Sequence, residues 1–372
     1  MNILFICGSL QPGEDGVGDY TRRLAGQLTR QGHRSTIVAI NDVRVCDPLK
    51  ELQADSGNSI NVLRLPKFSS WKERLILVQD WIKKEAPDWV SLQFVPFAFH
   101  DKGLPVSLAR YLKAIPGNHK WHIMFHELWV GAENIKFWIL GQVQKRLIAS
   151  LIKTLEATVV HTHLPLYYDD LKSFGIQVKQ LPLFSNFGNC QLPAKSKSET
   201  FRVGFFNQVA DDKRVMVFLQ SLYDEALINK MKFEVLLIGG AKSSIQNFGS
   251  KLEEIPRFKD KIVYTGFLAK DEITPALSSC NLGMTPLAYS TLGKSGTSAA
   301  FLSSGIPMAV PNLDFRRKPF FDTEILEALV TEPKMEQISK ASIAAKKCQQ
   351  TLHVQRIANM FLNDLSNGNY DS

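Results

Sequence analysis

The chain has 372 residues, of which 45% are hydrophobic and 22% charged, so it can build full hydrophobic cores and does not have the composition of a disordered protein. This length predicts about two or three domains. The formal net charge of +8 is compatible with nucleic acid, anionic lipid or an anionic substrate. No nucleic-acid-binding motif is present, so we expect no nucleic-acid partner.

The N-terminal segment and the distribution of cysteines indicate the cellular compartment. The sequence begins with an apolar strand-like segment, without a basic leader or cleavage site, and no uncharged segment reaches the ~18 residues that cross a bilayer. The five cysteines are scattered and predict neither a disulfide framework nor a zinc site. We therefore expect a cytoplasmic protein.

The first half of the chain alternates strand-like and helical patterns. Residues 1–7 predict a strand, residues 9–18 a glycine-containing loop, and residues 19–31 a helix with apolar residues at helical spacing. Further strands are expected at 35–40, 60–64, 89–94, 122–126, 157–162 and 178–182, with helices at 72–85, 106–114 and 143–155.

One helical segment of this half has two interpretations. Residues 136–155 mix apolar side chains with Lys145, Arg146 and Lys153. Such a segment can lie on an anionic membrane surface, which would place the protein peripherally at the inner face of the membrane. It can equally be an amphipathic helix that packs on its own domain.

The second half repeats the alternation after a polar, lysine-rich linker at 186–200 that Gly and Pro interrupt. Strands are expected at 201–206, 233–238, 262–265, 282–285 and 307–310, with helices at 213–227, 244–254, 270–278 and 298–303. The pattern predicts an α/β protein with two doubly wound, Rossmann-like domains that face a cleft, at 1–185 and 201–345. Residues 346–372 are expected to form a helix that packs back toward the N-terminal domain.

Two glycine-containing turns are candidate ligand sites, because ligands bind at the carboxyl ends of parallel strands. Gly16 and Gly18 precede the first helix, where they either admit an anion or only turn tightly. Near the other end, Lys294 and residues 295–297 (Ser-Gly-Thr) precede an apolar helix. A helix start with an adjacent lysine suits the phosphates of a nucleotide, although an ordinary strand-to-helix turn with a solvated lysine has the same pattern.

Four segments carry a family resemblance. They are MNILFICGSLQPGEDGVGDYTRRLAGQLTRQGH, FEVLLIGGAKS, KIVYTGFLAKDEITPALSSCNLGMTPL and SGIPMAVPN. In order and spacing they resemble GT-B-fold glycosyltransferases of the large retaining family 4 over nearly the whole chain. The resemblance implies that a nucleotide sugar (UDP- or GDP-linked) binds the C-terminal domain and an acceptor binds the N-terminal domain. It implies transfer with retention, without a metal or a separate cofactor.

The resemblance also implies roles for individual residues. Lys213 matches a lysine that contacts the diphosphate, while Gln208 or Asn207 stands where the family has arginine, and Arg214 is a candidate to compensate. His126 matches a histidine near the transferred sugar, although a histidine at a strand end is often only a structural hydrogen-bonding group. The predicted catalytic residues are His126, Lys213 and Lys294, and the predicted binding residues are Gly16, Gly18, Gln208, Arg214, Ser295, Gly296 and Thr297.

Two further histidines, His161 and His163, end another predicted strand. One of them can face the cleft, but their spacing also suits a strand with both side chains on one face. No third ligand accompanies them, so we expect no metal site.

The chain departs from the family at one motif. Two glutamates with seven residues between them usually flank the C-terminal phosphate loop, and here Leu292 and Ala300 stand at those positions. We therefore keep two hypotheses: an active transferase in polysaccharide, glycolipid or glycoconjugate assembly, or a catalytically degenerate GT-B protein that binds a sugar or a partner. The acceptor would be a glycan, a lipid-linked molecule or a small molecule. A GT-B sugar-nucleotide epimerase is a more distant third hypothesis.

Overall fold

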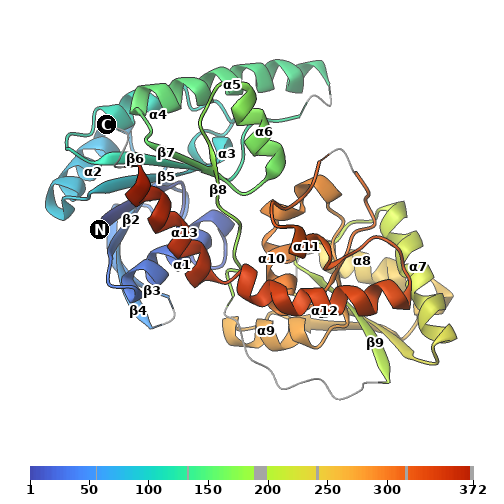
Figure 1. Cartoon of the computed structure of the whole chain (residues 1–372). Coiled ribbons are helices and arrows are strands. Elements are labelled where there is room, and N and C mark those ends of the chain that lie inside the picture. The colour runs from blue at the N-terminus through green and yellow to red at the C-terminus, as the bar shows by residue number, and fades with distance from the viewer. Residues whose placement is uncertain (56, 132–133, 188–198, 240–242, 315–316, 369–372) are drawn as a thin grey trace. The chain divides into compact units, whose positions relative to one another are not determined.

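The computed structural model of the chain describes residues 1–55, 57–131, 134–187, 199–239, 243–314 and 317–368, which form two compact units (Figure 1). Unit 1 comprises Met1–His163, Tyr167–Leu181 and Ile357–Ser372. Unit 2 comprises Leu164–Leu166 and Pro182–Arg356. Most of the linker expected at 186–200 lies outside the described residues.

Unit 1 contains an eight-stranded sheet in the order β3-β4-β2-β1-β5-β6-β7-β8. All neighbouring strands are parallel except β3 and β4, which pair antiparallel at one edge. The strands are β1 (Asn2–Cys7), β2 (Arg34–Asp42), β3 (Leu49–Asp55), β4 (Asn58–Pro66), β5 (Trp89–Phe94), β6 (Lys120–Phe125), β7 (Val159–Thr162) and β8 (Lys179–Gln180).

Helices cover both faces of this sheet, as buried parallel strands require. On one face, α2 (Trp71–Glu85), α4 (Leu108–Lys113) and α5 (Ile135–Leu155) share an apolar core with the strands. The other face carries α1 (Gly16–Arg30) and α13 (Val354–Asn367), whose Phe361 stacks on Phe5 at a centroid distance of 6.1 Å. The shorter helices of this half of the chain are α3 (Pro96–Phe99) and α6 (Pro165–Ser173).

Unit 2 contains a six-stranded parallel sheet in the order β11-β10-β9-β12-β13-β14. Its strands are β9 (Thr200–Phe206), β10 (Lys232–Ile238), β11 (Ile262–Gly266), β12 (Leu282–Met284), β13 (Met308–Ala309) and β14 (Leu329–Val330). Its helices are α7 (Lys213–Ile228), α8 (Ser243–Glu253), η1 (Pro256–Phe258), α9 (Lys270–Ser278), η2 (Tyr289–Lys294), α10 (Gly296–Ser303), α11 (Thr323–Leu326) and α12 (Met335–Thr351). Two apolar clusters join these helices to the sheet.

The predicted fold class, two doubly wound Rossmann-like α/β domains, is confirmed, but three helices begin two or more residues earlier than predicted. The cause is the capping residue in each case, since a side-chain acceptor allows the helix to begin sooner. Asp15 caps α1 so that it begins at Gly16, Asn134 caps α5 so that it begins at Ile135, and Ser295 caps α10 so that it begins at Gly296.

Candidate functional site

The loop between β1 and α1 contains the first pair of predicted glycines. The Asp15 carboxylate accepts a hydrogen bond of 2.7 Å from the Gly18 N–H and so caps the helix. A Cβ at Gly18 would lie 2.7 Å from the Ser9 carbonyl oxygen, so close packing explains this glycine. Gly16 is exposed, and a Cβ there would meet nothing within 4 Å. Only Gly16 therefore leaves open space at the helix start.

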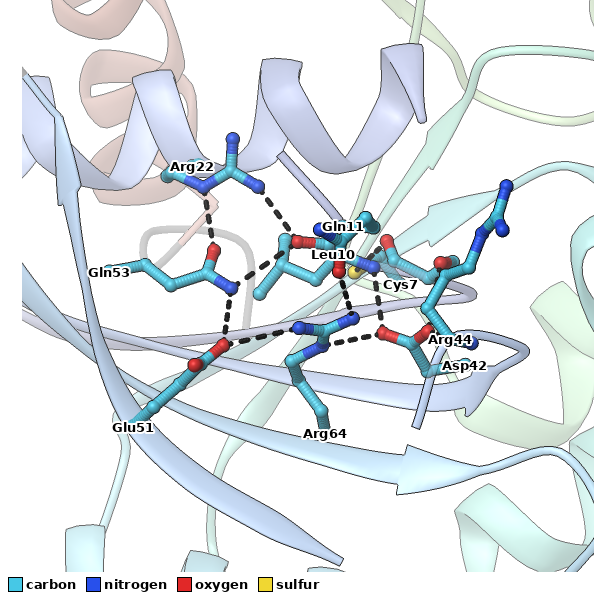
Figure 2. A network of polar contacts seen from close by, with 10 residues as sticks. Cys7, Leu10, Gln11, Arg22, Asp42, Arg44, Glu51, Gln53 and Arg64 are labelled. Carbon is cyan, nitrogen blue, oxygen red and sulfur yellow. Dashed lines mark hydrogen bonds and ion pairs between the residues drawn. The ribbon is translucent and has the colours of Figure 1, made fainter. Parts of the chain in front are cut away.

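A buried ion pair between β2 and β4 holds this loop in place (Figure 2). The Arg64 guanidinium donates to the Asp42 carboxylate at 2.8 Å, and the two side chains are 6% and 0% exposed. The same carboxylate accepts from the Leu10 N–H at 3.1 Å and from the Ser9 hydroxyl at 3.2 Å. Burial opposes the ionised carboxyl, but the hydrogen bonds from Arg64, Arg44 and Leu10 outweigh it and lower the pKa of Asp42. The pair is therefore a charged structural anchor for the loop.

A second arginine fixes the loop from the helix side. Arg22 of α1 donates to the Leu10 carbonyl at 2.9 Å and to Gln53 of β3 at 2.7 Å. Gln53 in turn donates to the Leu10 carbonyl at 3.3 Å (Figure 2). Sequence reasoning missed these residues because β2, β3, β4 and α1 bring them together from separate segments, and a lone charged residue in a strand gives no local signal.

In unit 2, polar side chains gather at the carboxyl ends of two neighbouring strands, β9 and β12. The Thr297 hydroxyl of α10 donates to the Phe206 carbonyl at the end of β9, at 2.9 Å. Oε1 of Gln208 lies 3.4 Å from the hydroxyls of both Thr285 and Ser295. The start of α10 is thus tied to the end of β9, and the hydroxyls of Ser295 and Thr297 have protein partners.

The start of α10 itself remains open. The Ser295 side chain accepts from the Ser298 N–H at 3.2 Å and caps the helix. Gly296 is exposed, and a Cβ there would meet nothing within 4 Å. Lys294 precedes the cap at the end of η2 and is half-buried. This is the same arrangement as at Gly16: an uncrowded glycine in the first turn of a helix.

The two basic residues at the start of α7 differ in their partners. Asp212 caps α7 and binds the Arg214 guanidinium, at 3.0 and 2.6 Å. Arg214 also donates to Asn312 at 2.6 Å. The hydrogen bonds between Asp212 and Arg214 raise the pKa of Arg214 and lower that of Asp212 to about 2, so both stay charged. Lys213 is exposed and makes no ion pair among the residues that the structure describes.

Leu292 and Ala300, which the sequence resemblance aligns with two glutamates, are core residues. Leu292 of η2 is 0% exposed and Ala300 of α10 is 1% exposed, and both belong to the apolar cluster on one face of the unit 2 sheet. The Leu292 and Ala300 side chains therefore belong to the core and present no surface to a ligand.

His126, the third predicted catalytic residue, follows β6 in unit 1 and is 7% exposed. Its Nε2 lies 2.9 Å from Oε1 of Gln93, and its Nδ1 lies 2.9 Å from Nε2 of His163. Burial and the neighbouring His163 lower the pKa of His126 well below its usual value, so it is neutral near pH 7. Gln93 was not predicted; its signal is the alternation of polar residues along one face of β5.

No group of three or more His, Cys, Asp or Glu side chains that could hold a metal ion occurs among the described residues. In the same part of the chain, no helix is both long and apolar enough to cross a membrane.

Comparisons with known proteins agree on the fold. The chain is similar to α,α-trehalose 6-phosphate synthase from Burkholderia multivorans, with 10% identity over 98% of this chain and 96% of that one, and a TM-score of 0.60. It is similar to a glycosyltransferase from Rickettsia africae, with 12% identity, coverage of 100% and 99%, and a TM-score of 0.60.

It is also similar to UDP-GlcNAc 2-epimerase from Neisseria meningitidis bound to UDP-GlcNAc, with 10% identity, coverage of 99% and 100%, and a TM-score of 0.52. No family model matches the sequence, and no curated protein matches it. At such low identity the likeness establishes the fold, which is GT-B, and leaves the activity to the site.

Proposed function

We propose that this protein is a retaining glycosyltransferase that moves a hexosyl group from a UDP- or GDP-linked sugar to an acceptor hydroxyl. The observation that carries the proposal is the carboxyl edge of the unit 2 sheet, where the open start of α10 at Gly296 is tied to the end of β9 and Lys213 follows on α7. Helix starts and a lysine are suited to a diphosphate.

The chemistry asks for positive charge where the nucleoside diphosphate departs, because negative charge accumulates there in the transition state. Lys213 and Lys294 supply that charge, and the N–H groups at the start of α10 add the positive end of a helix dipole. Neither lysine needs a metal ion to do this. Arg214 contributes less, since Asp212 already neutralises its guanidinium.

His126 is proposed to face the transferred sugar, and Gly16 to admit a phosphate or the acceptor in unit 1. The imidazole of His126 is neutral, and its two nitrogens already bond to Gln93 and His163, so a sugar hydroxyl would bond to it in place of one of these partners. The acceptor is proposed to be a glycan, a lipid-linked molecule or a small molecule, in polysaccharide, glycolipid or glycoconjugate assembly.

The first prediction concerns Lys213. With a panel of UDP- and GDP-sugars, one donor is expected to stabilise the wild type in a thermal-shift assay, by about 2.7 kcal/mol at a hundred times its Kd. Lys213→Ala is expected to lower kcat/KM by ~10²-fold or more and to reduce the thermal shift. The reason is that the substitution removes a positive charge that would otherwise stabilise the diphosphate. An effect below about threefold would remove Lys213 from the site.

Lys232→Ala is the matched control. Lys232 is also an exposed lysine of unit 2, but it begins β10 at the opposite, amino edge of the sheet. It should leave both the donor shift and kcat/KM unchanged.

The buried Leu292 and Ala300 favour a second candidate, the catalytically degenerate binding protein. That protein would show the donor shift and its loss in Lys213→Ala, yet no transfer to any acceptor in a broad screen. An epimerase would instead convert the sugar of the nucleotide sugar to its isomer with no acceptor present. Product analysis of donor-only and donor-plus-acceptor reactions separates these three activities.

We also propose a peripheral contact with anionic membranes through the start of α5. The second half of α5 packs on its own domain through Ile148, Leu151 and Leu155. The first turns are different: Ile135, Trp138 and Ile139 are 75%, 52% and 52% exposed. An exposed aromatic and aliphatic cluster beside basic residues suits the interface of an anionic bilayer.

The second prediction tests this contact. The double variant Trp138→Ser, Ile139→Ser should lower partition onto vesicles of phosphatidylcholine and phosphatidylglycerol by ~10-fold or more. The reason is that it removes two large apolar side chains that would move from water into the bilayer interface. Binding should also weaken as salt rises. The control is Ile228→Ser, which removes an exposed isoleucine from α7 in unit 2. Equal binding of all three proteins, or binding that ignores salt, would contradict the proposal.

A further inference from the structure

A chain of hydrogen-bonding groups crosses the buried polar face of the unit 1 sheet. Its members come from alternate positions of three neighbouring strands and the residues just after them: Ser91, Gln93, His122, His126, His161 and His163. All six are buried, with at most 7% exposed. We call this set, with its two end groups, the histidine relay.

The relay consists of seven contacts in sequence. From one end they are Leu181 O to Nδ1 of His163 at 2.8 Å, Nε2 of His163 to Nδ1 of His126 at 2.9 Å, and Nε2 of His126 to Oε1 of Gln93 at 2.9 Å. Nε2 of Gln93 then lies 2.7 Å from Oγ of Ser91, and that oxygen lies 2.7 Å from Nδ1 of His122.

The last two contacts are Nε2 of His122 to Nδ1 of His161 at 2.9 Å, and Nε2 of His161 to the carboxylate of Asp364 in α13 at 3.0 Å. Lys179 of β8 pairs with the other oxygen of Asp364 at 2.9 Å. Burial opposes ionisation of Asp364, but hydrogen bonds from His161 and Lys179 outweigh it and keep the pKa of this carboxyl low. Each end of the relay is therefore an acceptor only.

The neutral relay has one proton fewer than it has hydrogen-bonding contacts. Each contact needs one proton, four neutral imidazoles supply one each, and Ser91 and Gln93 supply one each along the chain. Six protons cannot fill seven contacts that end on acceptors. One contact must lack its proton, or the relay must hold one proton more than its neutral form.

The orientation of the Gln93 amide decides where the gap falls. When Oε1 of Gln93 points toward His126, three contacts lie between Leu181 and Gln93. His126 and His163 donate one proton each, so one of these three contacts has no proton. When the amide is flipped, its N–H donates to Nε2 of His126, so all three of these contacts have a proton. The contact without a proton then lies on the other side of Gln93, at His122 and His161 beside Asp364.

We propose that the relay is a single proton-binding unit that takes up one proton from solvent, holds it on His122 and His161 beside Asp364, and thereby fixes His126 as the Nδ1–H tautomer. The proton leaves water and forms the second N–H of one imidazole, so the relay gains one positive charge opposite the Asp364 carboxylate. Gln93 then donates to Nε2 of His126. A second proton would place two adjacent imidazolium groups in a buried site.

Among the residues that the structure describes, charged and aromatic side chains from α13, β8 and α1 face the relay. Asp364 of α13 and Lys179 of β8 lie at one end, and Tyr20 of α1 packs edge-on against His126 and His163 at the other, with centroid distances of 4.9 and 5.4 Å. Phe361 of α13 lies against His122, at 5.0 Å. Asp364 is the carboxylate that faces the relay, so the extra charge belongs at its end.

A consequence for catalysis rests on the proposed function. If His126 contacts the transferred sugar, then Gln93 and His163 are positioning residues, because they determine which nitrogen of His126 carries the proton. Proton uptake by the relay does not require a bound substrate. It can therefore be tested on the free protein, and its failure would not bear on transferase activity.

The test is ¹⁵N NMR of the histidine side chains in the full chain, for wild type and Asp364→Asn. In wild type at neutral pH, His161 should carry its proton on Nε2, facing Asp364, and acidification should add about one proton shared by the relay, with one common midpoint. In Asp364→Asn the new amide can donate to Nε2 of His161 and so supplies the seventh proton without charge. All four histidines should then be Nδ1–H tautomers, and the shared proton uptake should be lost.

Two further variants make the test decisive. Lys179→Gln removes the charge beside Asp364 but keeps the carboxylate acceptor, so one-proton uptake should persist. Gln93→Leu splits the relay into two halves that each have as many protons as contacts, so uptake should disappear even if Asp364→Asn fails to fold. Histidines that titrate with separate midpoints, or an Asp364→Asn protein in which His161 keeps its Nε2 proton, would overturn the proposal.

Discussion

Arg64→Leu is expected to lower the free energy of unfolding of unit 1 by about 3–5 kcal/mol, because it leaves the Asp42 carboxylate buried without its counter-ion. Asp42 is 0% exposed, so water cannot replace the guanidinium. The loop at residues 9–18 should loosen as well, since Asp42 also holds the Leu10 N–H. Urea unfolding followed by tryptophan fluorescence reports on this unit specifically, because all six tryptophans lie within it.

The matched control is Arg44→Leu. Arg44 also pairs with a carboxylate, that of Glu14, but the two side chains are 56% and 46% exposed. Exposed ion pairs contribute about 0–1 kcal/mol, so this variant should unfold nearly as the wild type does. Adding Asp42→Asn to Arg64→Leu should recover part of the loss, because it removes the unpaired charge. Equal unfolding midpoints for Arg64→Leu and Arg44→Leu would show that the buried pair is not an anchor.

Unit 1 is expected to lose about 3–4 kcal/mol of stability between pH 7 and pH 5.5. Burial lowers the pKa of His122, His126, His161 and His163, in the case of His163 to about 4. The folded pKa values thus lie below the unfolded value of about 6.5, so below that pH the unfolded chain binds more protons and stability falls. A histidine that stays neutral in the folded chain down to pH 5.5 accounts for about 1.2 kcal/mol over this interval, and with one shared proton on the relay three such histidines remain.

The measurement is the urea midpoint of the fluorescence transition at several pH values. Unit 2 is an internal control, since His353 is its one histidine. Its transition, followed by far-UV circular dichroism, should depend much less on pH in this interval. The carboxylates with lowered pKa values, Asp42 and Asp364, lose their contribution only at lower pH, as they protonate below their unfolded value of about 3.9. A fluorescence midpoint that does not change from pH 7 to 5.5 would contradict the prediction.

The sequence predicted the regular elements well where one face of a strand or helix is apolar. Residues 89–94 and 270–278 were predicted with the observed bounds of β5 and α9. The antiparallel strand β3 was missed because most of its residues are polar and exposed at the sheet edge, so it has no apolar pattern. Sheet order was also beyond local patterns, since it depends on which segments pair at long range.

The candidate site was predictable to the extent that it follows strand ends. The start of α10 and Lys213 lie at the carboxyl edge of their sheet, where the βα pattern led us to expect ligand residues. The state of each side chain was not predictable. That Arg214 is held by Asp212, whereas Lys213 is unpaired among the described residues, depends on rotamers and on Asn312, which is distant in sequence.

The histidine relay shows the same limit in another form. The two-residue spacing of His161 and His163 suited a strand with both side chains on one face, and the structure places them so. Ser91, Gln93 and His122 have the same alternation in their own strands but were not recognised. A polar residue at every second position of adjacent buried strands is the signal that would have found them, because buried polar groups require partners.

The position of α13 has a consequence for how the chain matures during translation. Its residues from Ile357 onward belong to unit 1, yet they follow the whole of unit 2 in the sequence. The ribosome therefore releases every strand of the first sheet long before Phe361 and Asp364 are made. Until then, Phe361 cannot stack on Phe5 and Asp364 cannot bond to His161, so unit 1 can complete its core only after unit 2 has been synthesised.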